Sequence, residues 1–442
     1  DPRNAYGPYF QRQRVEIYHT YAKSLVERGL AYPCFCTEEE LDKVRAKQEE
    51  DKVLTGYYGE YATCRNLSYE EIEANIKAGK PYVLRLRSQG SPDKEITFVD
   101  AIKGEIKLPE NIHDIVLLKK DGIPTYHFAH AIDDHLMRTT TVVRGGEWLA
   151  SAPIHYELFH LLGFKMPAYA HTAHLMKFDE ETGGKRKLSK RKDPELSLDY
   201  YRKDGYHPYT MKVYLLTLLN SNFEEWHEKF PDKDINEFPF SVEKMNQSGA
   251  LFDKDKLHNI CKNELSKLSE EELYDFLYDW AKENEPENVE KWFGDREKML
   301  QILRLYMGVG AKRRRKDLMY AKQIFELISY FFDGESAEEM DEFKLDEDMV
   351  SKILKSYLAK YDHNDDNSVW FNKLKEIADE HGFASDMKAY KANPENFKGN
   401  VSDIAEAVRI AVTGRANTPD LWTIVHIMGE EQMTERIKKH IK

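Results

Sequence analysis

The chain of 442 residues is too long for one hydrophobic core, which predicts several domains, and its 41% hydrophobic content argues against global disorder. A formal charge of −13 argues against a general nucleic-acid coat, so a nucleic-acid partner would have to be held by local basic patches. No apolar run approaches the roughly 18 residues of a membrane span. Only four cysteines occur, which favours a reducing compartment over a disulfide framework.

Helix signals dominate the start of the chain. The apolar spacing predicts a helix over residues 9–28, ended by Gly29. Two further helices are predicted where Ser or Thr stands three residues before Glu, which is the spacing of a capping box. These two pairs are Thr37–Glu40 and Ser68–Glu71.

Strand signals follow. Apolar and basic residues alternate over residues 82–87, as in a half-buried strand, and residues 114–118 form an apolar strand. Asp121-Gly122 is a hairpin signal that leads into residues 123–129. The first 125 residues therefore predict an α+β region.

The next segment has the pattern of strand, tight turn, helix and strand. An apolar strand over residues 141–143 ends at Arg144. A helix is predicted over residues 148–162, and a second apolar segment covers residues 169–176. This order predicts half of a parallel nucleotide-binding sheet.

The second half of the chain has few strand signals, and residues 264–442 are predicted to be almost entirely helical. An apolar helix is predicted over residues 208–219. Near the end, Thr418 is predicted as the N-cap of a helix, with Pro419 at its first position and Gly429 at its stop.

Two basic runs stand out on this acidic chain. Six of the eight residues from 185 to 192 are basic, and Gly183 and Gly184 before them predict a flexible loop. Mobile cations suit catalysis on a triphosphate, because charge builds on its oxygens in the transition state. The alternative is a solvated basic patch. The second run, residues 312–316, is interpreted either as a solvated helix start or as a phosphate or base contact.

Arg144 is predicted at the carboxyl end of a strand, where α/β sheets bind ligands. Its planar guanidinium suits a carboxylate. Glu147 and Trp148 open the helix that follows. The alternative interpretation is a surface turn with a core tryptophan.

Two clusters contain residue types that bind metals. Three histidines and two aspartates lie within residues 127–135, but the interleaved apolar residues favour packed, hydrogen-bonded side chains at least as strongly. Cys34, Cys36 and Cys64 would supply most of a zinc site. Because no histidine lies between Cys36 and Cys64, buried unpaired cysteines are the favoured interpretation.

Together and in this order, the motifs resemble those of the bacterial glutamyl-tRNA synthetases, which are class I aminoacyl-tRNA synthetases. The resemblance extends over essentially the whole chain, and the combination is specific although no single motif is. The segments that carry it are Gly7-Pro8-Tyr9, Cys34-Phe35-Cys36-Thr37, residues 116–136, residues 144–149, residues 187–191, residues 197–201, and Thr413-Gly414 with Thr418-Pro419.

The resemblance implies a multidomain fold that is α/β in its first part and all-α in its last. It comprises the second half of a class I Rossmann-type nucleotide-binding domain, an inserted α+β connective domain, a stem-contact region and two helical anticodon-binding domains. The implied boundaries are 1–125 for the connective, acceptor-binding domain, 126–180 for the Rossmann-type half, 181–263 for the stem-contact region, and 264–370 and 371–442 for the anticodon-binding domains.

The resemblance also implies a reaction. Members of the family use ATP and Mg²⁺ to convert L-glutamate to glutamyl-adenylate, and then transfer the glutamyl group to the 3′ end of tRNA(Glu). The expected partners are therefore tRNA(Glu), L-glutamate and ATP. We expect a cytoplasmic monomer that does not associate with membranes.

By position, the resemblance assigns the chemistry to the first basic run, where Lys190 is expected to stabilise charge in the transition state. The other assignments follow the family's pockets. They are Lys187, Ser189, Lys190 and Arg191 for catalysis; Lys190, Glu147, Trp148, His174 and Leu175 for ATP; Arg144, Tyr126 and His130 for glutamate; and Arg314 and Arg315 for tRNA.

Some features depart from the family pattern. A His-Ile-Gly-His-type signature is expected upstream of Asp1, so we expect this chain to begin within a longer protein and to lack half of its active site. Gly146 stands where relatives usually carry an acidic residue, and His130 stands where some carry Asn. Asn66 stands where zinc-containing relatives have a ligand, so zinc at the three cysteines is an alternative that is not favoured.

Two rival interpretations remain at this stage. Glutaminyl-tRNA synthetases end in β-barrels, and the enzyme that glutamylates queuosine on tRNA(Asp) has no anticodon-binding region, so a helical tail disfavours both. A non-catalytic tRNA-binding module is a rival of another class. Such a module would have no need for an ATP loop of the type at residues 187–191.

Overall fold

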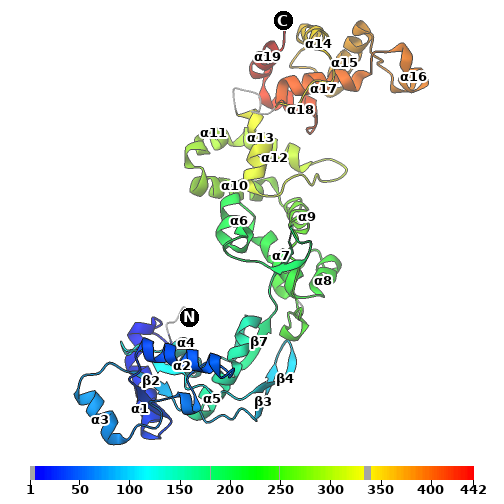
Figure 1. Cartoon of the computed structure of the whole chain (residues 1–442). Coiled ribbons are helices and arrows are strands. Elements are labelled where there is room, and N and C mark those ends of the chain that lie inside the picture. Colours follow the sequence, from blue (N-terminus) through cyan, green and yellow to red (C-terminus); the bar gives the residue numbers. More distant parts are fainter. Residues whose placement is uncertain (1–4, 180, 248, 333–339) are drawn as a thin grey trace. The chain divides into compact units, whose positions relative to one another are not determined.

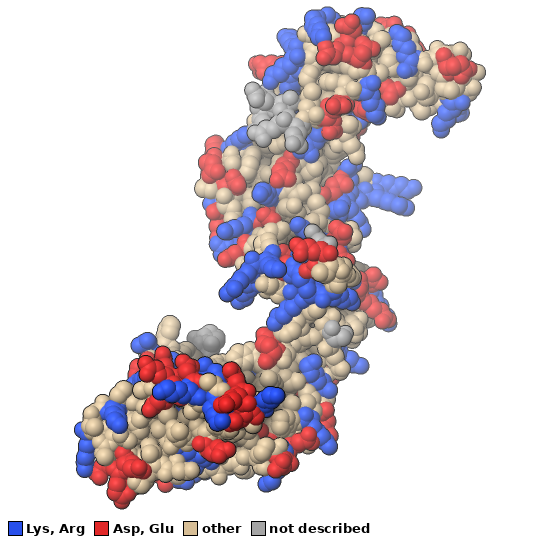
Figure 2. All heavy atoms as spheres, viewed as in Figure 1, with Lys and Arg blue, Asp and Glu red and all other residues tan. Residues whose placement is uncertain are grey.

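The computed structural model describes residues 5–179, 181–247, 249–332 and 340–442. Its elements form two compact units (Figure 1). The first unit consists of Asp1–Lys187 and Thr217–Phe252, and the second of Leu188–Leu216 and Asp253–Lys442. On the face shown in Figure 2, Lys and Arg are interspersed with Asp and Glu, so no single charged field covers it.

A three-stranded antiparallel sheet lies in the first unit, in the order β1 (Ala31–Cys34), β2 (Val83–Leu86) and β5 (Val116–Leu118). Three helices share one core with it, namely α1 (Val15–Glu27), α4 (Tyr126–Leu136) and α5 (Ala152–Leu162). Fully buried side chains of this core include Tyr18, Leu25, Leu86, Leu117, Phe128 and Phe159. The other helices before β2 are η1 (Gln11–Arg14), α2 (Glu38–Glu50), η2 (Gly59–Tyr61) and α3 (Tyr69–Lys77).

The second sheet of the first unit positions the candidate site. Its order is β4 (Gly104–Pro109), β3 (Glu95–Asp100), β7 (Ala168–Thr172) and β6 (Thr141–Gly145). Strands β6 and β7 are parallel, joined by η3 (Gly146–Ser151) and α5, and β3 is also parallel to β7. The predicted half of a parallel sheet is therefore confirmed. The hairpin of β3 and β4 belongs to the same sheet, so the predicted boundary at residue 125 falls between strands that are hydrogen-bonded into one sheet.

Local sequence signals account for several of these elements. Both capping boxes are present, because Thr37 and Glu40 cap α2 and Ser68 and Glu71 cap α3 by exchanging hydrogen bonds between side chain and backbone. The helix predicted over residues 9–28 begins later, as η1 followed by α1. The helix predicted over residues 148–162 begins with the 3₁₀ turn η3, and α5 proper starts at Ala152.

Two strand predictions need correction. The strand over residues 82–87 is not half-solvated, because Arg85 is buried, with its guanidinium carbon 4.0 Å from the centre of the Tyr57 ring. Its Nη1 donates to the carbonyl of Asp114, whereas its buried Nε has no hydrogen-bond partner among the described residues, so the aromatic ring and one carbonyl hold the cation inside the fold. The hairpin signal at Asp121-Gly122 does make a tight turn, with Gly122 at φ +77° and an antiparallel bridge between Leu118 and Pro124, but the segment that follows does not continue to residue 129 because α4 begins at Tyr126.

The remaining residues of the first unit, after Thr217, are mainly helical. They include α8 (Phe223–Lys229), η5 (Ile235–Glu237) and η6 (Val242–Lys244). The helix α7 (Pro208–Leu219) has the predicted bounds, and its residues are divided between the two units.

The second unit is helical throughout the part that the structure describes, apart from a single bridge between Ala384 and Asn400. Its helices are η4 (Pro194–Leu196), α6 (Leu198–Asp204), α9 (Lys254–Leu265), α10 (Glu270–Asn284), η7 (Pro286–Asn288), α11 (Val289–Phe293), α12 (Arg296–Met307), α13 (Ala321–Ile328), η8 (Ser329–Phe331), α14 (Glu347–Lys360), α15 (Asn367–His381), α16 (Met387–Ala392), η9 (Pro394–Asn396), α17 (Val401–Thr413), α18 (Leu421–Met428) and α19 (Glu430–Lys438). The predicted helical tail is confirmed.

One continuous buried core runs through the second unit from Leu265 to Ile437. The predicted boundary at residue 370 lies inside α15. The cap predicted at Thr418 is wrong: Asp420 is the N-cap of α18, and its carboxylate accepts the N–H of Thr423. No helix among the described residues is long and apolar enough to cross a membrane.

Gly205 lies where the end of α6 packs closely against α10 and α13. It ends α6 with φ +78°, and its carbonyl accepts the N–H of Ala321 at the start of α13. A Cβ at this position would collide with the Cβ of Ala321 and would lie 2.8 Å from Nε1 of Trp280. Gly382 is a matched comparison, because it ends α15 with φ +82° but has only ordinary contacts with Lys398.

We expect Gly205→Ala to destabilise the second unit much more than Gly382→Ala. The left-handed conformation alone costs about 1–2 kcal/mol for a residue with a Cβ. Overpacking against α10 and α13 adds about 1–3 kcal/mol for Gly205→Ala only. Thermal unfolding followed by circular dichroism measures the difference, and equal losses in the two variants would contradict the packing argument.

Candidate active site

Arg144 lies at the carboxyl end of β6, as the sequence predicts, and its guanidinium is hydrogen-bonded on several sides. Nε donates to Nε2 of His171 at 2.9 Å, and Nη1 donates to Nδ1 of His155 at 3.1 Å. Nη2 is 3.4 Å from the carbonyl oxygen of Trp148. The guanidinium carbon also lies 4.6 Å from the centre of the Tyr169 ring. A guanidinium has five N–H donors, and the Tyr126 side chain is a further hydrogen-bond partner of Arg144, so a ligand on the open side would meet the remaining N–H together with Tyr126.

Aromatic rings form a wall beside Arg144. The rings of Tyr126 and Trp148 are 4.7 Å apart between centroids, and Tyr126 stacks on His130 at 5.7 Å with an angle of 8° between planes. Tyr126 is half-exposed, whereas the His130 side chain is 6% exposed and its Nε2 is 2.7 Å from the hydroxyl of Tyr169. Tyr126 therefore presents the open surface, and His130 lies beneath it as support.

The histidines and aspartates of residues 127–135 do not converge on one point. Among the described residues, only the cysteines form a group of three or more with metal-ligating spacing. Asp133 instead accepts from Arg14 and Tyr18, and the ring of His135 stacks on Phe164 at 3.7 Å. The interpretation as packed, hydrogen-bonded side chains is therefore confirmed.

Three buried polar residues near Arg144 were not predicted from the sequence as part of the site. Asp100, His155 and His171 are each 1% exposed or less, and all three lie around Arg144 or its partner. The available signal was a polar residue within an apolar segment, since His171 interrupts the run over residues 169–176 and Asp100 ends β3. That signal does not identify which partner such a residue meets.

Burial controls the charge of these rings. Burial is the largest cause, and together with the nearby charges of His130 and Arg144 it lowers the pKa of His155 to about 2. Burial also lowers the pKa values of His127 and His171. Near neutral pH all three rings are therefore uncharged, which is the form that can accept a hydrogen bond from Arg144.

Glu147, His174 and Lys187 lie close together at the edge of the same sheet. Oε2 of Glu147 is 3.4 Å from Nε2 of His174, and Nζ of Lys187 is 3.4 Å from the same nitrogen. The Glu147 carboxylate folds back over Gly145, where a Cβ would collide with it. The structure thus brings together Arg144, Tyr126, Trp148, Glu147, His174 and Lys187 of the predicted site, with Leu175 adjoining His174 in the chain.

The predicted flexible glycine-led loop is instead the turn of a hairpin. β8 (Met176–Phe178) pairs with β9 (Lys185–Lys187), and Gly183 takes φ +68° in the turn between them. The carboxylate of Asp179 accepts the N–H groups of Glu181 and Thr182 and so fixes this turn. The basic side chains at residues 185–187 are therefore presented by strand β9.

The rest of the basic run belongs to the second unit, which contains Ser189, Lys190 and Arg191. This segment is held by the buried Asp193, whose carboxylate accepts the N–H of Ser189 at 2.7 Å. Lys190 and Arg191 are exposed. The local fold thus fixes the backbone of the run and leaves both cations open to solvent.

The three predicted zinc ligands lie together. The Sγ atoms of Cys34, Cys36 and Cys64 are all within 4.8 Å of one another, and the Tyr57 hydroxyl is 3.4 Å from Cys34 and 3.3 Å from Cys36. Hydrogen bonds from Cys36 and Cys64 lower the pKa of the Cys34 thiol. The same contacts raise the pKa of the Cys36 thiol, so the fit to zinc rests on the closeness of the three sulfurs, which would supply three of the four ligands of a zinc site.

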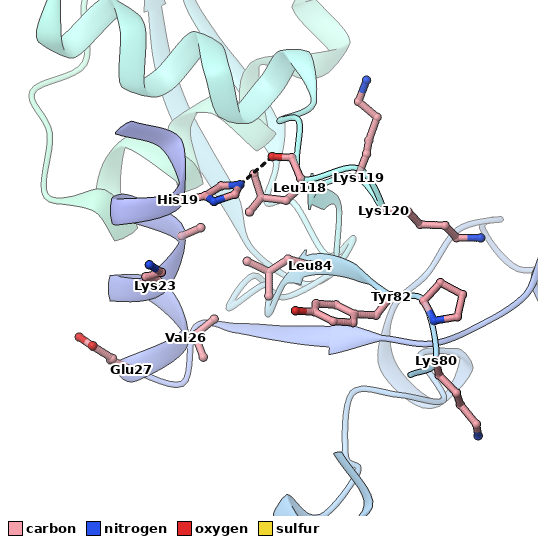
Figure 3. Close-up of a pocket in the computed structure, with 13 residues that line it drawn as sticks. His19, Lys23, Val26, Glu27, Lys80, Tyr82, Leu84, Leu118, Lys119 and Lys120 are labelled. Carbon is pink, nitrogen blue, oxygen red and sulfur yellow. Dashed lines mark hydrogen bonds between the residues drawn. The ribbon is translucent and has the colours of Figure 1, made fainter. Parts of the chain in front are cut away.

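Two hollows carry further basic residues. In the second unit, Arg304, Arg313, Arg315 and His426 line a hollow of about 750 Å³ beside α12 and α18, and Arg315 pairs with Asp317 at 2.6 Å. The neighbouring Arg314 is exposed. In the first unit, a hollow of about 520 Å³ has Tyr82 and Leu84 in its floor. Lysines 80, 119 and 120 extend around its edge in Figure 3.

Comparison with known families agrees with this architecture. The family of class I tRNA synthetases for E and Q matches in its catalytic domain over residues 2–259. The anticodon binding domain family matches over residues 272–441. The parallel half-sheet lies within the first match, and the second match covers part of the helical unit.

Individual relatives are more specific. The chain is 53% identical to a glutamate–tRNA ligase of Acetivibrio thermocellus, covering 98% of this chain and 79% of the relative. It is 47% identical to a glutamate–tRNA ligase of Clostridium perfringens, covering 98% and 80%. A solved structure of a glutamate tRNA ligase from Elizabethkingia meningosepticum, in complex with its amino acid, is 26% identical with a TM-score of 0.74, covering 98% of this chain and 84% of that one. The chain belongs to the bacterial glutamate–tRNA ligases.

The neutral histidines around Arg144 predict acid sensitivity. A histidine whose pKa is lowered by folding binds a proton more readily in the unfolded chain. Stability is therefore lost as pH falls below the unfolded value of about 6.5, by about 1.4 kcal/mol per pH unit for each such proton. His155 contributes to this loss over the whole range down to its folded pKa of about 2.

We expect urea unfolding of the first unit to show this loss between pH 7 and pH 5. In His155→Gln the dependence on pH should be less steep, because one of the protons is removed. An unchanged slope in that variant would show that His155 is protonated in the folded protein.

Proposed function

We propose that the chain attaches L-glutamate to tRNA(Glu) in two steps, activation with ATP and transfer to the tRNA 3′ end. The observation that carries this proposal is the half-buried guanidinium of Arg144, which stands at the carboxyl end of a parallel strand beside a half-exposed tyrosine. Ligands bind at that edge in α/β sheets. The family to which the chain belongs supplies the identity of the reaction.

In this proposal Arg144 binds a carboxylate of glutamate through its remaining N–H donors. A planar guanidinium recognises a carboxylate with two parallel hydrogen bonds, which gives orientation as well as affinity. Tyr126 contributes the exposed wall of the subsite. His130 acts beneath it, since its ring stacks on Tyr126 and is itself buried.

ATP is proposed to bind along the adjacent edge, beside Glu147, Trp148, His174 and Leu175. Lys187 and the exposed Lys190, with Ser189 and Arg191, are proposed to meet the phosphates, where fixed cations stabilise developing charge. Mg²⁺ takes most of its ligands from phosphate oxygens and water, and Glu147 is the carboxylate at this edge. A basic run on an acidic chain is then explained by the triphosphate that it contacts.

The tRNA is proposed to contact both units. Residues 1–125 would hold the acceptor end, and the lysine-edged hollow of Figure 3 supports this role. Residues 181–263 would contact the stem, and residues 264–370 and 371–442 the anticodon region, through Arg314 and Arg315 beside the hollow at α12. We propose a cytoplasmic monomer, in keeping with four free thiols.

The main test is glutamate charging of bulk tRNA with ATP and Mg²⁺. It compares this chain with the same chain preceded by the upstream segment of the Acetivibrio thermocellus relative. Charging by at least one form supports the proposal. Absence of charging by both forms would favour a tRNA-binding module without catalytic activity.

In the form that charges tRNA, we expect Lys190→Ala to lower kcat by about 100-fold, which is typical for loss of one preorganised electrostatic group. Lys192→Ala is the matched control, because Lys192 is an exposed lysine two residues further along the same segment. The control should keep nearly full activity. Equal activity of the two variants would overturn the role of Lys190.

We also propose that Cys34, Cys36 and Cys64 would hold a structural zinc ion, and the Tyr57 hydroxyl lies close to two of these sulfurs. The proximity of the three thiols supports this proposal over separate buried cysteines, which the sequence favoured. Zinc would tie β1 to the segment around Cys64 and so stabilise this part of the first unit.

Elemental analysis of the purified chain should then find about one zinc per chain, as a structural site with one ion requires. Cys64→Ser should lose the metal and unfold at a lower temperature. Cys261→Ser is the control, because Cys261 is buried in the second unit and should not affect zinc. A chain without zinc would return the cluster to three unpaired cysteines.

A further inference from the structure

The hydrogen-bond directions around Arg144 can be assigned from chemistry alone. An arginine side chain only donates, and it stays protonated in proteins. Nε2 of His171 must therefore accept from Arg144, and its ring proton must be on Nδ1. In the same way Nδ1 of His155 must accept from Arg144, and its proton must be on Nε2.

Each ring is held in that tautomer by a second partner. Nδ1 of His171 is 2.6 Å from Oδ2 of Asp100, and a carboxylate can only accept, so the ring donates to it. Nε2 of His155 is 2.9 Å from Nδ1 of His127, which accepts the proton of His155. The two chains of hydrogen bonds thus run from Arg144 to Asp100 and from Arg144 to His127.

Of these two series of hydrogen bonds, the one through His171 is anchored by more contacts. Asp100 and His171 are 1% and 0% exposed. Besides the ring, Asp100 accepts the backbone N–H of His171, and its other oxygen accepts the N–H groups of Ile102 and Lys103. The carboxylate is therefore fixed by backbone donors from two segments, and it fixes the imidazole in turn.

Neither Asp100 nor His171 can reach a ligand, because both side chains are buried behind Arg144. Burial lowers the pKa of His171, so the ring remains a neutral acceptor. Burial acts to raise the pKa of Asp100, but the hydrogen bonds from His171 and from backbone N–H groups outweigh it and lower that pKa, so Asp100 stays ionised. A neutral ring orients the guanidinium without neutralising its charge. The charge therefore stays available to a carboxylate on the open side.

We propose that Asp100 and His171 are positioning residues for glutamate binding, and that they act by fixing the tautomer that orients the guanidinium of Arg144. The proposal rests on the proposed role of Arg144 as the glutamate carboxylate ligand. Neither residue contacts the substrate, and each acts through the next. The same logic operates when a buried aspartate sets the tautomer of a histidine in hydrolases.

The test uses two substitutions of His171 that separate its two hydrogen bonds. In His171→Asn the amide reaches Asp100 but is too short to reach Arg144. In His171→Gln the longer side chain places an amide oxygen near the Nε2 position, where it accepts from Arg144. The measurement is the KM for glutamate in tRNA charging, with the KM for ATP and thermal unfolding as references.

We expect His171→Asn to raise the KM for glutamate about 10-fold or more, the effect of losing one hydrogen bond to a charged group. His171→Gln should restore most of this loss. The KM for ATP should not change in either variant. A rise of equal size in both variants, or a rise in both KM values, would show a merely structural role and overturn the proposal.

A spectroscopic readout does not depend on activity. In ¹H–¹⁵N spectra of the histidine-labelled chain, His171 should carry its proton on Nδ1 and His155 on Nε2. In Asp100→Asn an amide NH2 can face Nδ1, so the His171 proton should move to Nε2, where the ring no longer accepts from Arg144. The hydrogen bond that orients Arg144 is then lost, and the KM for glutamate should rise as in His171→Asn. An unmoved proton, or an Nε2 proton in the unsubstituted chain, would overturn the proposal.

Arg144→Gln distinguishes failure of this inference from failure of the proposed function. If it raises the KM for glutamate while His171→Asn does not, Arg144 binds glutamate without help and the positioning role is wrong. If Arg144→Gln leaves that KM unchanged, the carboxylate ligand itself is misassigned, and the positioning role falls with it.

Discussion

The half-buried guanidinium of Arg144 is the constraint on which the site depends. Removing a cation from water costs several kcal/mol unless hydrogen-bond acceptors pair with its N–H donors. The surrounding groups must therefore supply these acceptors and still leave one side of the guanidinium accessible to a ligand. The acceptors come from three elements: His171 on β7, His155 on α5 and the carbonyl of Trp148 in η3. Burial of Arg144 is therefore stabilised only when β6, β7 and the connection between them, η3 and α5, are all folded.

Parallel pairing explains how distant residues meet at this point. β6 and β7 are in register with Arg144 opposite His171, and β3 joins β7 with Asp100 opposite Tyr169. Three polar residues from three strands thus lie at the same edge, because parallel strands present their carboxyl ends together. The hairpin of β3 and β4 is for this reason part of the site, although it lies in the region predicted to be connective.

The features that local chemistry controls could be predicted from the sequence. The capping boxes of α2 and α3, the strand that ends at Arg144 and the helical tail depend on residues a few positions apart. The partners of Arg144 could not be predicted. His171 is 27 residues from Arg144, Asp100 is 71 residues from His171, and nothing in the local sequence marks either pairing. The two glycines at residues 183 and 184 predict a flexible loop, whereas the pairing of β8 with β9 places them in a turn.

The choice of neutral rings rather than carboxylates beside Arg144 has a functional consequence. A carboxylate in direct contact would compete with the substrate, because it would occupy the same donors and cancel the same charge. Asp100 is instead kept one imidazole away, where it sets the proton position of His171 and still favours a cation nearby. His155 repeats this arrangement with a neutral partner, His127. The guanidinium is thus oriented from behind by groups that do not compete for its remaining donors, which is what a carboxylate-binding arginine requires.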